Sequence, residues 1–125
     1  MTTEIVKLQG AAYWGKIPDE FAEGLVMEAI LRPKEKEFAM ELNWEGQSYS
    51  VELRRKEDGA FRGGWTCYPR EGTAECRLFP SGNLYFLWGT WIEDGGEYKW
   101  SAKLKKVERF SREPIPKPKR SRKTG

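Results

Sequence analysis

The chain has 125 residues, of which 38% are hydrophobic, 33% charged and 14% aromatic, and it contains six tryptophans. A chain of this length can fold as one domain with its own core, without disulfides or metals to hold it together. The formal net charge is +3 and there is no histidine. The lack of histidine excludes a Ser-His-Asp triad, a Cys-His dyad and every zinc site that uses histidine.

Basic residues are concentrated at the C-terminus. Residues 111–125 contain six lysines and arginines and one glutamate, a charge of +5, which leaves −2 for residues 1–110. Pro114, Pro116 and Pro118 favour extended, solvated backbone, and the basic run that follows has no apolar residue to bury. We therefore predict a folded domain over residues 1–110 and a disordered tail over residues 111–125.

The first third of the chain fits more than one pattern. Residues 5–8 are typical of a strand that leads into Tyr13 and Trp14. Residues 19–31 fit either an amphipathic helix or an alternating strand. Because Gly24 would cost a helix about 1 kcal/mol, we favour a strand over residues 24–32.

From residue 37 onward, apolar and polar residues alternate in short runs, which indicates strands with one buried face. Residues 37–44 and 48–54 are the clearest runs, and a short glycine-containing turn separates them. In the next run, Gly63-Gly64 predicts a bulge or a sharp bend of the kind that small barrels use to curl. Another short strand begins at Cys76.

Residues 83–92 differ because both faces of the predicted strand are apolar, and such strands are usually covered on both sides. One face carries Leu84, Phe86, Trp88 and Ile92. The second face carries Tyr85, Leu87 and Trp91, and we expect these three to form either an exposed ligand or partner patch or a face covered by the N-terminal segment. Four tryptophans that continue an alternating register are expected in the core: Trp44, Trp65, Trp88 and Trp100.

Residues 98–105 are predicted to form a last alternating strand, whose second face is solvent-exposed and cationic with Lys99, Lys103 and Lys105. The count is seven or eight consecutive strands joined by short glycine turns. This pattern predicts an all-β fold, a small antiparallel up-and-down meander closed into a barrel. A strongly bent sheet with one short N-terminal helix is the alternative.

The strand rhythm resembles that of avidins and lipocalins, and residues 87–110 are loosely similar to the last hairpin of an avidin. The N-terminal Gly-x-Trp motif of those families is absent, and Ala12-Tyr13-Trp14-Gly15 stands in the nearest position. The resemblance therefore concerns architecture, and no ligand or binding residue is carried over from it.

Catalytic motifs are missing from the sequence. There is no P-loop, no dinucleotide-binding glycine motif and no nucleophile elbow. Glu37, Glu41 and Glu52 alternate with core residues, so we expect them on the solvent face and not in an acid–base pair. Cys67 and Cys76 are most simply free thiols, although a disulfide across a hairpin stays open. We expect no enzyme activity, no cofactor and no metal.

The basic residues suggest a polyanion as partner. Five of them lie in the tail: Lys117, Lys119, Arg120, Arg122 and Lys123. Such a run attracts phosphates by counterion release, and Lys103 and Lys105 would extend the positive surface onto the domain. The leading hypothesis is a non-enzymatic binding or adaptor module that contacts nucleic acid or another polyanion.

Two alternatives remain at this point. One is a small-molecule-binding barrel with a mouth lined by Trp and Tyr. The other is a protein-interaction module or homodimer that uses Tyr85, Leu87 and Trp91. No apolar run is long enough for a membrane helix and the start lacks signal-peptide features, so we expect no membrane partner and a cytoplasmic protein, nuclear if the source is eukaryotic.

Overall fold

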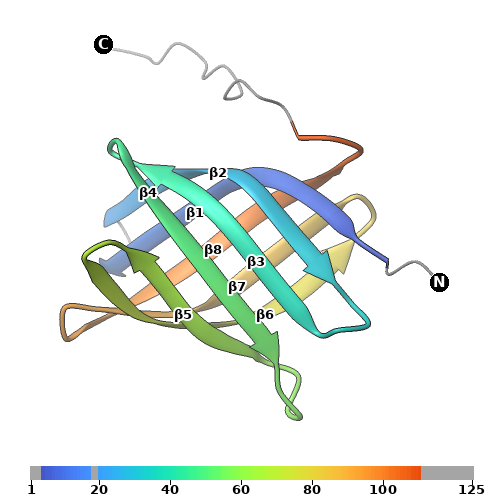
Figure 1. The fold of residues 1–125 in the computed structure, drawn as a ribbon. Coiled ribbons are helices and arrows are strands. Elements are labelled where there is room, and N and C mark those ends of the chain that lie inside the picture. The colour runs from blue at the N-terminus through green and yellow to red at the C-terminus, as the bar shows by residue number, and fades with distance from the viewer. Residues whose placement is uncertain (1–3, 18–19, 111–125) are drawn as a thin grey trace.

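The computed structural model describes residues 4–17 and 20–110, which form a closed antiparallel barrel (Figure 1). Its eight strands are β1 (Val6–Ile17), β2 (Glu20–Arg32), β3 (Glu37–Trp44), β4 (Gln47–Arg55), β5 (Phe61–Cys67), β6 (Arg70–Ser81), β7 (Leu84–Glu93) and β8 (Gly96–Val107). Each strand pairs with the next, and β8 closes the barrel on β1. The predicted all-β meander barrel is confirmed.

The alternative with an N-terminal helix is wrong, because residues 20–32 form β2 and the described residues contain no helix. The strand predicted over residues 24–32 is therefore confirmed. No helix in the described part of the chain is long and apolar enough to cross a lipid bilayer. The tail predicted over residues 111–125 lies outside the described residues.

Alternate turns lie at opposite ends of the barrel. The turns at 45–46, 68–69 and 94–95 share one end, here called the aromatic end. The turns at 33–36, 56–60 and 82–83 share the other end, where β8 also finishes, and this is called the tail end.

Two hairpin turns set the register of the strands beside them. Glu45 and Gly46 have φ angles of 51° and 78°, and Asp94 and Gly95 have φ angles of 53° and 78°. Two consecutive positive φ angles are typical of the two-residue turn whose twist suits a hairpin. The second turn pairs β7 with β8 so that Trp91 lies opposite Tyr98 and Leu87 opposite Ala102.

The predicted bulge at Gly63-Gly64 is wrong. The pairing of β4 with β5 runs without a shift from Ser50 and Thr66 to Arg55 and Phe61. Gly63 instead allows a close approach of the two strands, since a Cβ there would lie 2.0 Å from the carbonyl oxygen of Glu52. The register shifts that the structure does contain lie between β1 and β2 and between β2 and β3.

The barrel interior is filled with apolar side chains from all eight strands. An eight-stranded barrel is just wide enough for side chains to fill it. The largest fully buried side chains are Trp65, Trp91, Trp100, Phe38, Leu8, Met40, Leu42, Leu87, Leu104, Val26 and Val51. Trp44 is half-buried and packs against this core.

The face of β7 with Tyr85, Leu87 and Trp91, which the sequence left as either exposed or covered, points inward. Leu87 and Trp91 are each 1% exposed, and Tyr85 packs against the core. The exposed-patch interpretation is therefore wrong for these three residues. The reason is the hairpin register: the lysine face of β8 must be outside, which puts Tyr85, Leu87 and Trp91 beside the inward residues of β8.

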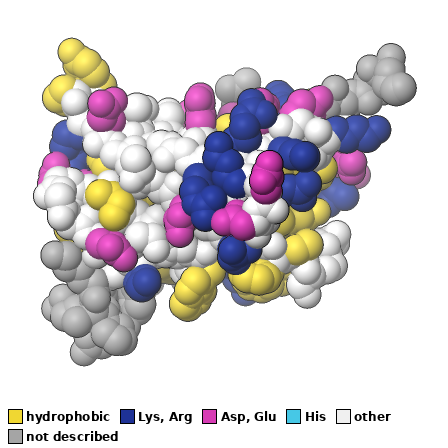
Figure 2. All heavy atoms as spheres, turned by 90° about the horizontal axis from the view of Figure 1, so that it is seen from below, with side chains coloured by type: hydrophobic (Ala, Val, Ile, Leu, Met, Phe, Trp, Pro, Cys, Tyr) yellow, Lys and Arg dark blue, Asp and Glu magenta, His cyan; other side chains and the backbone are white. Residues whose placement is uncertain are grey.

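The opposite face of β7 reaches the surface. Trp88 is 66% exposed and Phe86 37%, so the expectation that Trp88 belongs to the core is wrong. Trp65 and Trp100 are each 1% exposed, as expected for core residues. Figure 2 shows hydrophobic side chains on the surface in several places, beside intermingled basic and acidic ones.

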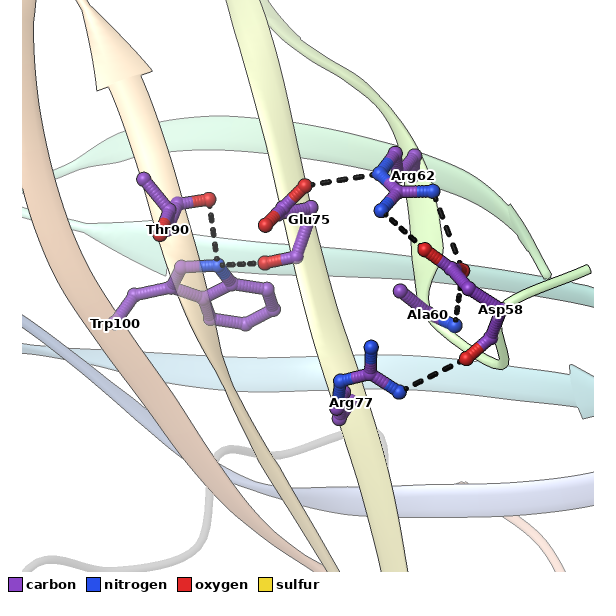
Figure 3. A network of polar contacts seen from close by, with 7 residues as sticks. All are labelled: Asp58, Ala60, Arg62, Glu75, Arg77, Thr90 and Trp100. Atoms are coloured by element: carbon purple, nitrogen blue, oxygen red, sulfur yellow. Dashed lines mark hydrogen bonds and ion pairs between the residues drawn. The ribbon is translucent and has the colours of Figure 1, made fainter. Parts of the chain in front are cut away.

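Trp100 joins three neighbouring strands through its indole nitrogen. Nε1 donates to the carbonyl oxygen of Glu75 on β6 at 3.0 Å and to that of Thr90 on β7 at 3.1 Å (Figure 3). Gly89 is the register partner of Trp100, and a Cβ at Gly89 would lie 1.8 Å from the same Glu75 oxygen. The glycine thus lets the strands come close enough for the indole N–H to donate to both carbonyl oxygens.

We predict that Trp100→Phe lowers the free energy of unfolding by about 2–4 kcal/mol, because two buried carbonyls lose their donor and a void is left in the core. Trp88→Phe is the matched control, and its exposed position predicts a change within about 0.5 kcal/mol. Denaturant unfolding followed by circular dichroism measures both. Equal effects of the two substitutions would contradict this role of Trp100.

Candidate functional site

Aromatic rings fill the barrel near the aromatic end, with Trp91 at their centre. The ring of Trp91 stacks on Trp65 at 5.2 Å between centroids, with 11° between the planes. Trp14 and Trp100 meet it edge to face at 5.2 and 5.8 Å, and Tyr49 lies 6.1 Å away. Such contacts stabilise aromatic pairs beyond the area they bury. The rings contact one another across the interior of the barrel.

Arg70, at the start of β6, covers these rings at the aromatic end. Its guanidinium donates to the hydroxyl of Tyr49 at 2.7 Å and forms an ion pair with Glu93. The guanidinium carbon lies 5.8 Å from the Tyr49 ring centroid and 5.9 Å from that of Trp65. Glu93 also accepts a hydrogen bond from Trp91 Nε1 at 2.9 Å. These contacts hold the guanidinium of Arg70 over the rings.

The contacts of the Arg70 guanidinium affect the pKa values of Arg70 and Tyr49. The hydrogen bond from Arg70 to Tyr49, the largest cause, raises the pKa of Arg70 above its ordinary value. Burial raises the pKa of Tyr49, and the hydrogen bond from Arg70 opposes that rise. Both groups thus keep their protons at neutral pH. A small-molecule site in this mouth would require Arg70 and the rings beneath it to move.

The outward face of β8 carries a row of lysines. Lys99, Lys103 and Lys105 are exposed, and their register partners on β7 are Thr90, Phe86 and Leu84. β8 as a whole contains four lysines and one glutamate. Among the described residues, none forms an ion pair with these three lysines. Their charges are therefore available to a partner.

Charge is unevenly distributed around the barrel. β2 and β3 together contain five glutamates and one arginine, in contrast to the lysine-rich β8. The near-neutral charge of the domain thus conceals strands of opposite net charge, with β2 and β3 acidic and β8 basic. A local field of one sign attracts ligands of the opposite sign even when the net charge is small.

Exposed aromatic side chains lie beside the lysine row. Phe79 on β6 is 52% exposed and is the register partner of Phe86, which in turn pairs with Lys103. Trp88 is 66% exposed and lies two residues after Phe86 on β7. We call this surface the aromatic–lysine face, and it consists of Phe79, Phe86, Trp88, Lys99, Lys103 and Lys105.

A hollow of about 290 Å³ opens on this face, lined by Tyr13, Trp88, Lys99, Trp100 and Ser101. Ser101 on β8 is the register partner of Tyr13 on β1 and of Trp88 on β7, so the hollow spans three adjacent strands. Burial, and secondly the charge of Glu23, raise the pKa of Tyr13. The Tyr13 hydroxyl is therefore neutral, and the hollow has two aromatic walls and a lysine.

A second hollow, of about 800 Å³, lies at the tail end around the turn from β4 to β5. Its lining includes five basic and two acidic residues, and Arg62 bonds Asp58 at 2.7 Å and Glu75 at 3.0 Å (Figure 3). The hydrogen bonds from Arg62, and then from the Ala60 N–H, lower the pKa of Asp58 to about 2. This hollow is therefore basic as well, but none of its lining residues is aromatic.

The structure brings together only part of the predicted site. Lys103 and Lys105 lie on the aromatic–lysine face, whereas Tyr85, Leu87 and Trp91 lie inside the barrel. Five predicted basic residues lie outside the described residues: Lys117, Lys119, Arg120, Arg122 and Lys123. Sequence reasoning missed Phe79, Phe86 and Trp88 as surface residues, although the Asp94-Gly95 turn contained the register that identifies Phe86 and Trp88.

The two cysteines are free. Cys67 pairs with Arg70 near the aromatic end, and Cys76 pairs with Phe61 farther along the same two strands, so the disulfide left open by the sequence does not form. Burial, and secondly the charge of Glu75, raise the pKa of the Cys76 thiol to about 12. Near neutral pH, fewer than about one Cys76 thiol in 10,000 is a reactive thiolate.

Comparisons with known proteins add no assignment to this geometry. No protein-family model matches the chain, and no curated protein matches it as a relative.

We predict that an alkylating reagent labels Cys67 in the folded protein and labels Cys76 only after denaturation, because Cys76 is buried and protonated. Mass spectrometry of peptides after timed labelling measures both sites, and the denatured protein is the control. Equal labelling of both thiols in the folded state would contradict this account, as would a disulfide-linked peptide.

Proposed function

We propose that this chain is a non-enzymatic module that binds nucleic acid through its aromatic–lysine face and its basic tail. The observation that carries the proposal is the row of Lys99, Lys103 and Lys105 on one exposed strand face beside exposed aromatic rings. Lysines gathered on one face are the electrostatic footprint of a nucleic-acid-binding domain. Aromatic side chains among them supply a surface for bases.

The geometry of the row suits an extended polyanion. Alternate residues of an antiparallel strand lie about 6.8 Å apart on one face, so the row from Lys99 to Lys105 spans about 20 Å. It runs toward the tail end, where β8 finishes at Val107. In sequence, the basic residues of 111–125 come after Glu108, Arg109 and Phe110, so the row and the tail are two basic segments close together along the chain.

The carboxylates support a binding role over a catalytic one. Glu37 pairs with Arg54 at 2.6 Å, and Glu41 accepts a hydrogen bond from Ser50 at 2.8 Å on the exposed face of β3 and β4. Carboxylates so placed contribute solubility and cross-strand pairing, not acid–base chemistry. Under this proposal the protein acts as an adaptor in the cytoplasm, or in the nucleus of a eukaryote.

We predict that Lys99→Gln, Lys103→Gln and Lys105→Gln together weaken binding to single-stranded DNA at low salt by about tenfold or more. They should also reduce the slope of log K against log salt by about 2, since each phosphate contact on a single strand contributes about 0.7. Removal of residues 112–125 should reduce the slope further. Fluorescence anisotropy across a salt series measures these values.

The matched control removes the same charge from the second hollow, by Lys36→Gln, Arg55→Gln and Lys56→Gln. These substitutions should change affinity much less, because no aromatic side chain lines that surface to stack on bases. Equal loss in both triple variants would mean that binding follows net charge only and not the aromatic–lysine face. No binding by the full chain at low salt would overturn the proposal.

A further inference from the structure

We infer that the aromatic–lysine face selects single-stranded over double-stranded nucleic acid, with an unpaired base in the hollow between Tyr13 and Trp88. This inference rests on the proposed function and names its substrate class. In a duplex the faces of the bases are stacked on one another, so only an unpaired strand can offer a base to an aromatic surface.

The hollow has the size and walls that a base requires. Its volume is about 290 Å³, at the lower limit of pockets that hold drug-sized molecules, so a single planar ring system fits it better. Trp88 stands on one side, 66% exposed, and Tyr13 stands on the other. Ser101 lies between them in the register and places a hydroxyl where it can donate to or accept from a base edge.

A lysine lies near two of the exposed rings. Lys99 lines the hollow itself, next to Trp88. Phe86 lies on the same side of β7 as Trp88, about 6.8 Å away along the strand, and its register partner is Lys103. The face therefore repeats a unit of one ring and one cation. Successive nucleotides likewise repeat one base and one phosphate, so the two repeats are complementary.

The charge of the face disfavours a second copy of the chain as its occupant. A symmetric dimer joins the same patch on both subunits. Through the aromatic–lysine face it would bring two rows of Lys99, Lys103 and Lys105 together, and like charges placed opposite one another are unfavourable. A strand of phosphates neutralises the row, and its bases cover the exposed rings.

The test compares Trp88→Ala with Tyr68→Ala in the full chain. Tyr68 is a matched control because it is 96% exposed and lies in the turn between β5 and β6, outside the aromatic–lysine face. The probes are a short fluorescent oligothymidylate and a duplex of the same length at the same salt. Circular dichroism checks that each variant is folded, and Trp88→Phe, which keeps a stacking ring, is measured beside them.

We expect Trp88→Ala to weaken oligothymidylate binding about tenfold and to leave duplex binding and the salt slope unchanged, since stacking releases no counterions. Trp88→Phe should lose less, and Tyr68→Ala should lose nothing. If Trp88→Ala binds both probes like the unchanged chain while the triple lysine variant is weakened, this inference fails and the proposed function stands. Failure of the unchanged chain to bind either probe would overturn both, and a change of oligomeric state in Trp88→Ala would make the face a protein interface.

Discussion

Trp91 packs against four other aromatic rings inside the barrel, and this packing determines what the two faces of β7 can do. Stacking on Trp65 and edge contacts with Trp14 and Trp100 hold the inward face in the core. Arg70 then covers the rings through Tyr49 and Glu93. Because side chains alternate along a strand, burial of Trp91 and Leu87 places Phe86 and Trp88 outside.

A filled interior moves the candidate site to the outer surface. The mouth of the barrel, where carriers of similar architecture hold ligands, is occupied by the protein's own tryptophans and arginine. The outer surface of β6, β7 and β8 instead combines exposed rings with three lysines. The same three strands thus offer both apolar surface and positive charge. The bases of a nucleic acid strand can contact the first and its phosphates the second.

Alternation and turn residues in the sequence were sufficient to predict the barrel, its meander order and the cationic face of β8. They did not reveal which apolar face of residues 83–92 is buried, because period-two alternation defines two faces without saying which one points inward. The Asp94-Gly95 turn resolves this, since it places Trp91 beside Tyr98. Tyr98 is on the side of β8 that does not carry the lysines, so Trp91 points away from the lysine face. The hollow at Tyr13 could not be predicted, because it requires the closure of β1 on β8.

The most direct measurement is an NMR titration of the isotopically labelled chain with a short oligothymidylate. The indole N–H signals separate the inner rings from the outer one. We expect shifts at Trp88 and at the backbone amides of Lys99, Ser101 and Lys103, with Trp65 and Trp91 unchanged. Shifts centred on Trp65 and Trp91 would instead place the ligand in the barrel mouth and contradict the account of a filled interior and an outer binding face.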